Sequence, residues 1–264
     1  PDIDFGVVPL HIIVGENDYI DDDKIDLTAM QENLSSYKGK TSTSSPSPHE
    51  WENAFGDADV VFCITITSSL SGTYNSAVIA KDIYEHNHTG RKVYVLDSLS
   101  TGPEIALFIE KIAELIKAGF APDDIYKTLL EYKDKTHLYF SLASLNNFAK
   151  NGRISPVIAA GIGLLGVRVV GKASDEGTLL PLDRGEKRAL KKLIDHLKEC
   201  GYTDGKIIIA HNNNEAGALE LKKLIENTFG IFNGTIQKTR ALCSYYAEPG
   251  SLLIGFEASL CNHK

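Results

Sequence analysis

The sequence DVVFCITI at Asp59–Ile66 runs directly into TSSLSGTY at Thr67–Tyr74, and this stretch decides the fold. A continuous apolar run of this length is typical of a strand that is buried on both faces of a parallel sheet. The pattern then predicts a helix over Asn75–Tyr84 and a second buried strand at Val93–Leu96, which ends in an Asp-Ser turn. Strands that alternate with helices in this way predict an α/β domain, in which ligands bind at the carboxyl ends of the strands.

The hydroxyl-rich turn at Thr67–Thr73 follows such a strand end. One serine would be enough to cap the next helix, whereas several hydroxyls with free backbone N–H groups form a neutral cradle for a carboxylate or phosphate. A serine acyl-hydrolase that uses Ser68 or Ser71 as its nucleophile is the alternative from the enzyme class. The sequence has no GxSxG motif here, and no histidine or aspartate partner can be placed, so anion binding is favoured.

A second α/β unit is predicted to begin near residue 152, after the turn NGRISP. We therefore expect an N-terminal domain over residues 1–152 and a smaller C-terminal α/β domain over residues 153–264. The second domain opens with a helix predicted at Val157–Leu165. An amphipathic helix is predicted over Lys187–Cys200, with Leu190, Leu193, Ile194 and Leu197 on one face. GIGLLG at Gly161–Gly166 matches the dinucleotide fingerprint, which requires a strand before it and a helix after it. Because Pro156 precedes these glycines and a predicted strand follows them, a nucleotide site is a disfavoured alternative.

The N-terminal segment is predicted to carry a strand, a helix and a loop. The strand covers Phe5–Val14, and Pro9 marks it as an edge strand or a bulge. A short helix is predicted over Asp26–Tyr37. Lys40–Pro48 is rich in Ser, Thr and Pro, so we interpret it as a loop, and Ser47 is expected to cap the helix that follows.

Composition and charge exclude several classes of protein. The chain carries 27 Lys and Arg and 35 Asp and Glu, a formal net charge of −8, so nucleic acid or an anionic membrane surface is not expected as its main partner. The longest apolar run, Val157–Val167, is too short for a membrane-spanning helix of about 20 residues. The four cysteines lack the spacing of zinc ligands, and neither a metal nor a cofactor is predicted. No secretory leader is recognisable, which favours a cytoplasmic protein.

Several short motifs resemble, in their order and spacing, the DegV family of fatty-acid-binding proteins. VVPLHIIVGENDYIDD (7–22) is similar to the family's VVPL strand and the turn after it, and TSTSSPSP (41–48) is similar to its Ser/Thr/Pro loop. ITSSLSGTYNSA (66–77), VYVLDSLS (93–100), NGRIS (151–155) and PGSL (249–252) follow in the family's order. Each motif alone is weak, but together they span nearly the whole chain.

The resemblance implies a two-domain α/β fold with a three-layer α/β/α N-terminal domain, whose usual first strand precedes the start of this sequence. It implies a protein that holds a long-chain fatty acid between the two domains and performs no chemistry alone. Some members are the binding subunit of a bacterial fatty acid kinase and present the carboxylate to a separate kinase subunit. Such a subunit is therefore an expected partner beside the fatty acid itself.

The resemblance also assigns site residues by position. Thr43 and Ser68 are the hydroxyls that would hold the carboxylate, and Thr67 stands where the family usually has a serine. Arg153 matches the arginine of the GRIS turn, and Arg184 matches a basic position after a hairpin of the second domain. These two arginines are expected around the site or facing the partner.

Three positions depart from the family pattern. Tyr246 stands where kinase-linked members have a histidine beside the lipid head group, and Glu248 replaces a glycine of the same motif. Asn151 replaces the first glycine of the GGRIS turn. A tyrosine hydroxyl can hydrogen-bond a carboxylate, but it cannot offer the positive charge of a histidine to a developing acyl phosphate. We therefore include Tyr246 in the head-group site. We expect the protein to support phosphorylation of the fatty acid by a kinase subunit weakly or not at all.

Overall fold

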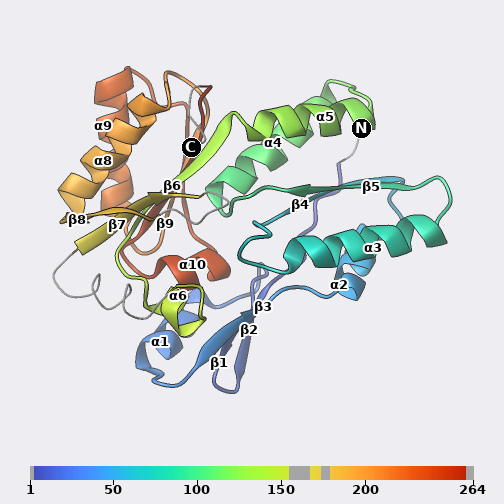
Figure 1. Cartoon of the computed structure of the whole chain (residues 1–264), viewed down its shortest axis with the longest axis horizontal. Coiled ribbons are helices and arrows are strands. Elements are labelled where there is room, and N and C mark those ends of the chain that lie inside the picture. The colour runs from blue at the N-terminus through green and yellow to red at the C-terminus, as the bar shows by residue number, and fades with distance from the viewer. Residues whose placement is uncertain (1–2, 155–166, 174–178, 260–264) are drawn as a thin grey trace.

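The computed structural model describes residues 3–154, 167–173 and 179–259, with the backbone alone for residues 179–184. The predicted α/β class is confirmed, because helices and strands alternate along the described residues and the strands form three sheets (Figure 1). Within these ranges no helix is long and apolar enough to cross a membrane. The helix predicted at 157–165 and the glycine motif at 161–166 lie outside the described residues.

The largest sheet contains six of the described strands, in the order β10-β9-β11-β6-β7-β8. Strands β9 and β10 are parallel, and all other neighbours are antiparallel. Strand β6 precedes residue 152 but pairs with β11 and β7, and the domain boundary at that residue stays a prediction. The six strands are β6 (Thr136–Leu142), β7 (Val167–Lys172), β8 (Leu179–Arg184), β9 (Ile207–His211), β10 (Gly234–Lys238) and β11 (Leu252–Glu257).

The stretch that decides the fold forms β4 (Val60–Thr65), which pairs in parallel with β5 (Lys92–Asp97). Successive side chains of a strand point to opposite faces, so β4 serves two cores. Cys63 packs with helices α2 and α3, whereas Phe62 and Ile64 pack with α4 and α5, which gives three layers. The four helices are α2 (Pro48–Phe55), α3 (Thr73–Asn87), α4 (Pro103–Lys117) and α5 (Pro122–Lys133).

The third sheet is small and antiparallel. It consists of β1 (His11–Val14) between β2 (Asn17–Ile20) and β3 (Thr41–Ser44), with α1 (Leu27–Ser36) packed on it through Met30. The interpretation of residues 40–48 as a loop is therefore wrong for residues 41–44, whose β-branched threonines suit a strand. The strand predicted at residues 5–14 is shorter than expected, because Pro9 has no N–H group to donate to a neighbouring strand.

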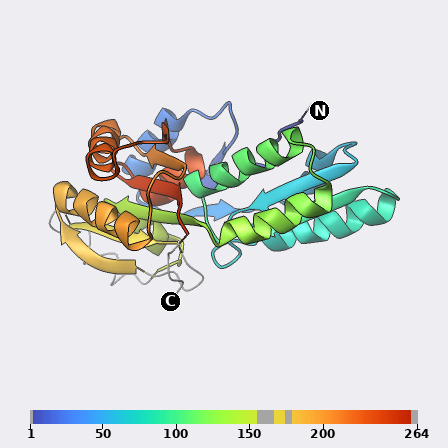
Figure 2. The same cartoon turned by 90° about the horizontal axis from the view of Figure 1, so that it is seen from above.

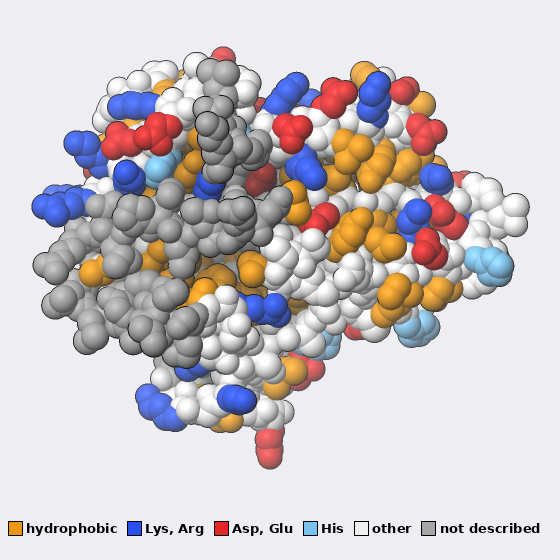
Figure 3. All heavy atoms as spheres, in the orientation of Figure 1, with side chains coloured by type: hydrophobic (Ala, Val, Ile, Leu, Met, Phe, Trp, Pro, Cys, Tyr) orange, Lys and Arg blue, Asp and Glu red, His pale blue; other side chains and the backbone are white. Residues whose placement is uncertain are grey.

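Helices α8 (Glu186–Glu199) and α9 (Glu215–Phe229) lie at the opposite end of the molecule from α3 (Figures 1 and 2). The apolar stripe of α8 is buried as predicted, since Leu190 and Leu197 share a core with Ile254 of β11. Two short helices were not predicted, α6 (Asn146–Lys150) and α10 (Ala241–Ala247). On the face drawn in Figure 3, hydrophobic side chains gather around β4 and β5, while charged side chains are scattered around them.

Candidate ligand-binding site

A cavity of about 390 Å³ is lined by residues of the small sheet, of the largest sheet and of the turns that follow β4 and β5. The turns after β4 and β5 both contribute to it, so it lies at the carboxyl ends of these strands, where a ligand site is expected in an α/β fold. Its volume falls in the range of about 300–1,000 Å³ that is typical of ligand pockets. Of the predicted site residues whose side chains the structure describes, four line this cavity: Thr43, Thr67, Arg153 and Tyr246.

The hydroxyls of Thr43 and Tyr246 meet at this cavity. Their oxygen atoms are 2.9 Å apart, although one residue lies on β3 and the other on α10. The ring of Phe148, from α6, packs against the Tyr246 ring with 4.8 Å between centroids. Two residues assigned separately in the sequence therefore form one polar group, held in place by an aromatic contact.

The turn after β4 brings Thr67 to the cavity but leaves Ser68 out of it. Thr67 is buried, its N–H donates to the Ser100 carbonyl at 2.9 Å, and its Oγ1 lies 2.9 Å from Ser69 Oγ. Ser68 is exposed, and its N–H donates to the Asp97 carboxylate at 3.1 Å. Ser68 is not among the described lining residues, and its role in ligand binding stays a prediction.

Further hydroxyls that the sequence analysis did not assign to the carboxylate also line the cavity. They lie at the end of β3, on the loop after it and on the turns after β4 and β5: Ser44, Ser45, Ser71, Ser100 and Thr101. The VLDSLS motif that ends at residue 100 was a signal for the turn after β5. This end of the cavity, which we call the hydroxyl end, can supply hydrogen bonds to an anion without a lysine or a metal.

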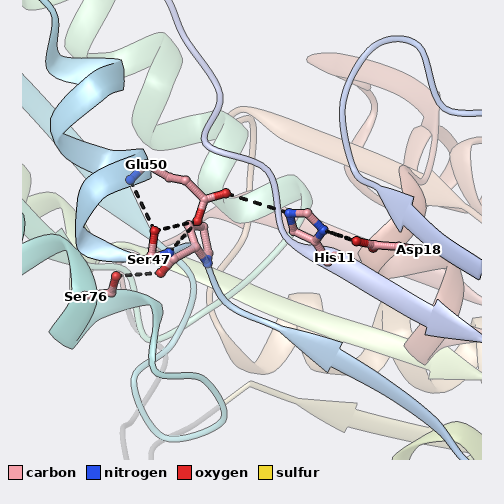
Figure 4. Close-up of polar contacts among 6 residues, drawn as sticks. His11, Asp18, Ser47, Glu50 and Ser76 are labelled. Carbon is pink, nitrogen blue, oxygen red and sulfur yellow. Dashed lines mark hydrogen bonds and ion pairs between the residues drawn. The ribbon is translucent and has the colours of Figure 1, made fainter.

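A polar network fixes the loop after β3, which carries Ser45 (Figure 4). Ser47 caps α2, and the Glu50 carboxylate accepts from the Ser47 N–H at 2.8 Å, which lowers the pKa of Glu50. His11 of β1 lies between Asp18, at 2.8 Å, and Glu50, at 3.8 Å. Ser76 of α3 donates to the Pro46 carbonyl at 2.5 Å. The loop after β3 is therefore fastened to β1, α2 and α3.

Strand β6 contributes a row of apolar side chains to the lining of the cavity. Leu138, Phe140 and Leu142 are alternate residues, so they share one face of the large sheet, and Leu253 of β11 lies opposite Phe140 on that face. No residue of α4 is among the described residues that line the cavity. The apolar face of α4 is instead buried in the core that it shares with β4, β5 and α5.

Two cationic residues, Arg153 and Lys172, also line the cavity. Arg153 is exposed, and its N–H donates to the Phe148 carbonyl at 2.9 Å, which ties the GRIS turn to α6. Arg184 ends β8, with its backbone opposite Val167 of β7, and its side chain lies outside the described part of the structure. The structure therefore brings Arg153 to the cavity, and the position predicted for the Arg184 side chain stays untested.

The described residues give little support to the hydrolase alternative. Ser71 Oγ lies 2.6 Å from Thr73 Oγ1, and no hydrogen bond between described residues joins Ser68 or Ser71 to a histidine. Cys243 also lines the cavity, but burial raises the pKa of its thiol to about 11, so it is not a ready nucleophile. No group of three His, Cys, Asp or Glu side chains that could hold a metal occurs in the ranges that the structure describes.

Fold and site together define an α/β binding protein whose apolar cavity ends in hydroxyl groups. The chain belongs to the DegV family, since residues 2–259 match the model of that family, which is described as one of uncharacterised proteins. A DegV domain-containing protein of Streptococcus pneumoniae is 40% identical over 255 residues, which cover 96% of this chain and 91% of the relative.

Two solved structures match the whole fold. One is a DegV family protein from Eubacterium eligens loaded with heptadecanoic acid, and the other is the Fatty Acid Kinase B3 protein of Streptococcus pneumoniae loaded with linoleic acid. Each is 40% identical to this chain, with a TM-score of 0.92. The matches cover 95% of this chain, 92% of the first structure and 90% of the second.

Proposed function

We propose that this protein binds a long-chain fatty acid in the cavity, with the carboxylate at the hydroxyl end and the acyl chain along β6. The observation that carries the proposal is the division of one cavity into a hydroxyl end and an apolar wall. Similarity to the Eubacterium eligens and Streptococcus pneumoniae proteins, which were solved with heptadecanoic acid and linoleic acid, supports it.

The acyl chain supplies most of the binding free energy in this proposal. A fatty acid of 16 carbons buries about fourteen CH₂ groups, and at about 0.8 kcal/mol each their transfer contributes about 11 kcal/mol before ordering costs. An ionised carboxylate in such a cavity must be hydrogen-bonded, because an unpaired buried charge is strongly unfavourable. The hydroxyl end therefore decides which head group is accepted.

Thr43, Thr67 and Tyr246 are the proposed partners of the carboxylate. A hydroxyl can donate one hydrogen bond while it accepts another, so the Thr43–Tyr246 pair can stay intact while one of its members donates to the ligand. Ser68 remains a proposed fourth partner, and a rotation of the turn after β4 would be needed to bring its exposed hydroxyl to the cavity.

The proposed biological role is to carry the fatty acid to a separate kinase subunit, with no catalytic step assigned to this chain. The similarity to a protein named as part of a fatty acid kinase supports this partner. Arg153 lies at the cavity, and Arg184 ends a strand of the same sheet as β6. We assign these two arginines to the surroundings of the head group or to the partner contact.

Mass spectrometry of lipid released from denatured protein tests the binding proposal. Protein from a bacterial host is expected to release a fatty acid of roughly 14–18 carbons, and added fatty acid should raise the melting temperature more than the alcohol of equal length. Repeated absence of lipid together with no stabilisation by added acid would refute the proposal. Release of a chromogenic acyl ester product by the pure protein would favour the hydrolase alternative.

A further inference from the structure

Glu104, the second residue of α4, is a carboxyl group buried beside the site. It is 4% exposed, and the backbone of β11 closes over it, since a Cβ at Gly255 would lie 2.5 Å from the Glu104 nitrogen. Burial raises the pKa of Glu104 to about 7, against the opposing effect of the Ser100 and Thr136 hydroxyls. The charge of this buried group can therefore change near neutral pH.

Ser100 and Thr136 form a small polar cluster with Glu104. Both hydroxyls are buried, neither forms a hydrogen bond of ordinary geometry with a described residue, and both lie near enough to Glu104 to act on its pKa. Ser100 also lines the cavity, and its carbonyl accepts the hydrogen bond from Thr67 at 2.9 Å. The cluster therefore lies directly behind the hydroxyl end, one residue away from the ligand.

We propose that Glu104 is a positioning residue of the head-group site and that its protonated form is required for tight binding of an ionised carboxylate. The inference rests on the proposed function, because it takes the head group to lie at the hydroxyl end. A neutral Glu104 can donate its proton to Ser100 Oγ, which leaves the Ser100 O–H free to turn towards the ligand. An ionised Glu104 can only accept, so it draws that O–H inwards and places a second negative charge behind the ligand.

The other titratable groups around α4 have partners of their own or face elsewhere. Glu257 of β11 lies opposite Thr136, and its carboxylate accepts from the Tyr132 hydroxyl and from the Lys206 N–H. Arg153 and Lys172 line the cavity and attract an anionic ligand in both charge states of Glu104. The titratable side chains on the remaining strands packed against α4 belong to the opposite faces of their sheets: His137 of β6, His211 of β9 and Cys63 of β4.

Ligand binding is therefore coupled to the uptake of one proton from solvent, which converts the Glu104 carboxylate to the acid. Below pH of about 6 the affinity should be flat, because Glu104 is already protonated there. Above pH of about 7 the dissociation constant should rise by up to about tenfold per pH unit. It should level off above the pKa that Glu104 has in the complex, because Glu104 is then ionised in both the free and the bound protein.

The test measures palmitate binding by the wild type, Glu104→Gln and Glu110→Gln between about pH 6 and pH 9, below the concentration at which palmitate aggregates. Glutamine is neutral throughout, so Glu104→Gln should bind at least about tenfold more tightly than the wild type at about pH 8.5 and should lose the slope. Glu110 lies on the same helix but is exposed and pairs with Lys206 at 3.1 Å, so its variant should keep the wild-type slope. The carboxyl group of palmitate titrates in all three experiments alike, so it does not affect the comparison between the proteins.

Calorimetry in two buffers with different ionisation enthalpies gives a second readout on the unmodified protein. The wild type should take up a proton on binding at about pH 8, and Glu104→Gln should take up none. No palmitate binding by the wild type at any pH would overturn the proposed function. Normal binding without proton uptake, with the same pH slope in wild type and Glu104→Gln, would overturn the role of Glu104 alone. If Glu104→Gln does not fold, proton uptake by the wild type decides the question.

Discussion

The Thr43 hydroxyl lies 2.9 Å from the Tyr246 hydroxyl, which joins β3 to α10 at the cavity. Two residues before Thr43 on the same strand, Thr41 makes the equivalent contact with Tyr245 at 2.6 Å. Tyr245 is fully buried in the core under the small sheet, so the second pair fixes the strand while the first pair lines the cavity. The position of the proposed head-group hydroxyls is therefore set by packing before a ligand enters, which would lower the ordering cost of binding.

Thr43→Val should weaken fatty-acid binding by about 1.5–3 kcal/mol, the range for a hydrogen bond to a charged group. Valine keeps the shape and the strand preference of threonine, so the fold should be retained. Binding of the fatty alcohol should change less than binding of the acid. Titration calorimetry with both ligands measures the difference.

Thr41→Val is the matched control, since it removes a hydroxyl from the same strand without touching the cavity. It should lower the free energy of unfolding by about 1 kcal/mol and leave fatty-acid affinity nearly unchanged. If Thr41→Val weakened binding as much as Thr43→Val, the effect would come from distortion of β3, and Thr43 would not be a direct ligand.

Thr67→Val and Ser68→Ala separate two neighbouring hydroxyls of the turn after β4. Thr67 is buried at the cavity, so its loss should weaken binding of the acid by about 1.5–3 kcal/mol. Ser68 is exposed, so Ser68→Ala should have a smaller effect in the structure as it stands. Affinities of both variants for palmitate measure the contrast. A larger loss in Ser68→Ala would show that the turn rotates and that Ser68 contacts the ligand.

Local patterns predicted the elements whose periodicity or length is clear. The run at residues 59–66 and the helix α8 are examples, because one is continuously apolar and the other carries a regular apolar stripe. β6 was missed although THLYFSL has strand composition, since it follows α5 with no glycine or proline to mark its start. α10 has seven residues and no cap from its own N-cap residue, so its helical form depends on tertiary contacts, namely the Asp21 carboxylate at its first N–H groups and packing around Tyr245.

The site was predictable as a set of positions but not as contacts. Strand ends and the resemblance placed Thr43, Thr67 and Tyr246 near one another, yet nothing local can show that Tyr246 pairs with Thr43, since 203 positions separate them. Glu104 was invisible for another reason. An acidic residue in the first turn of a helix normally serves the helix dipole in solvent, and only the close approach of β11 at Gly255 buries this one.

Tyr246→His should raise acyl-phosphate formation by a partner kinase subunit more than it changes fatty-acid affinity. A protonated histidine can stabilise the charge that develops as the carboxylate is phosphorylated, whereas a tyrosine offers a neutral hydroxyl. A reconstituted assay with a kinase subunit from the same source measures this, with binding determined in parallel. Efficient acyl-phosphate formation by the unmodified protein, undiminished in Tyr246→Phe, would show that this position does not decide kinase support.

Glu104→Gln should make the protein more stable than the wild type at alkaline pH and leave the two equally stable below about pH 4.5. The folded state holds the Glu104 proton up to about pH 7, while the unfolded chain releases it near 4.5, so the folded state binds more protons between these values. Stability that is fully present below 4.5 is therefore lost as the pH rises through 7. A shift from 4.5 to about 7 corresponds to a loss of up to about 3 kcal/mol. Urea unfolding of wild type, Glu104→Gln and Glu110→Gln at several pH values measures it. Parallel stability curves for wild type and Glu104→Gln would show that Glu104 ionises normally in the folded protein.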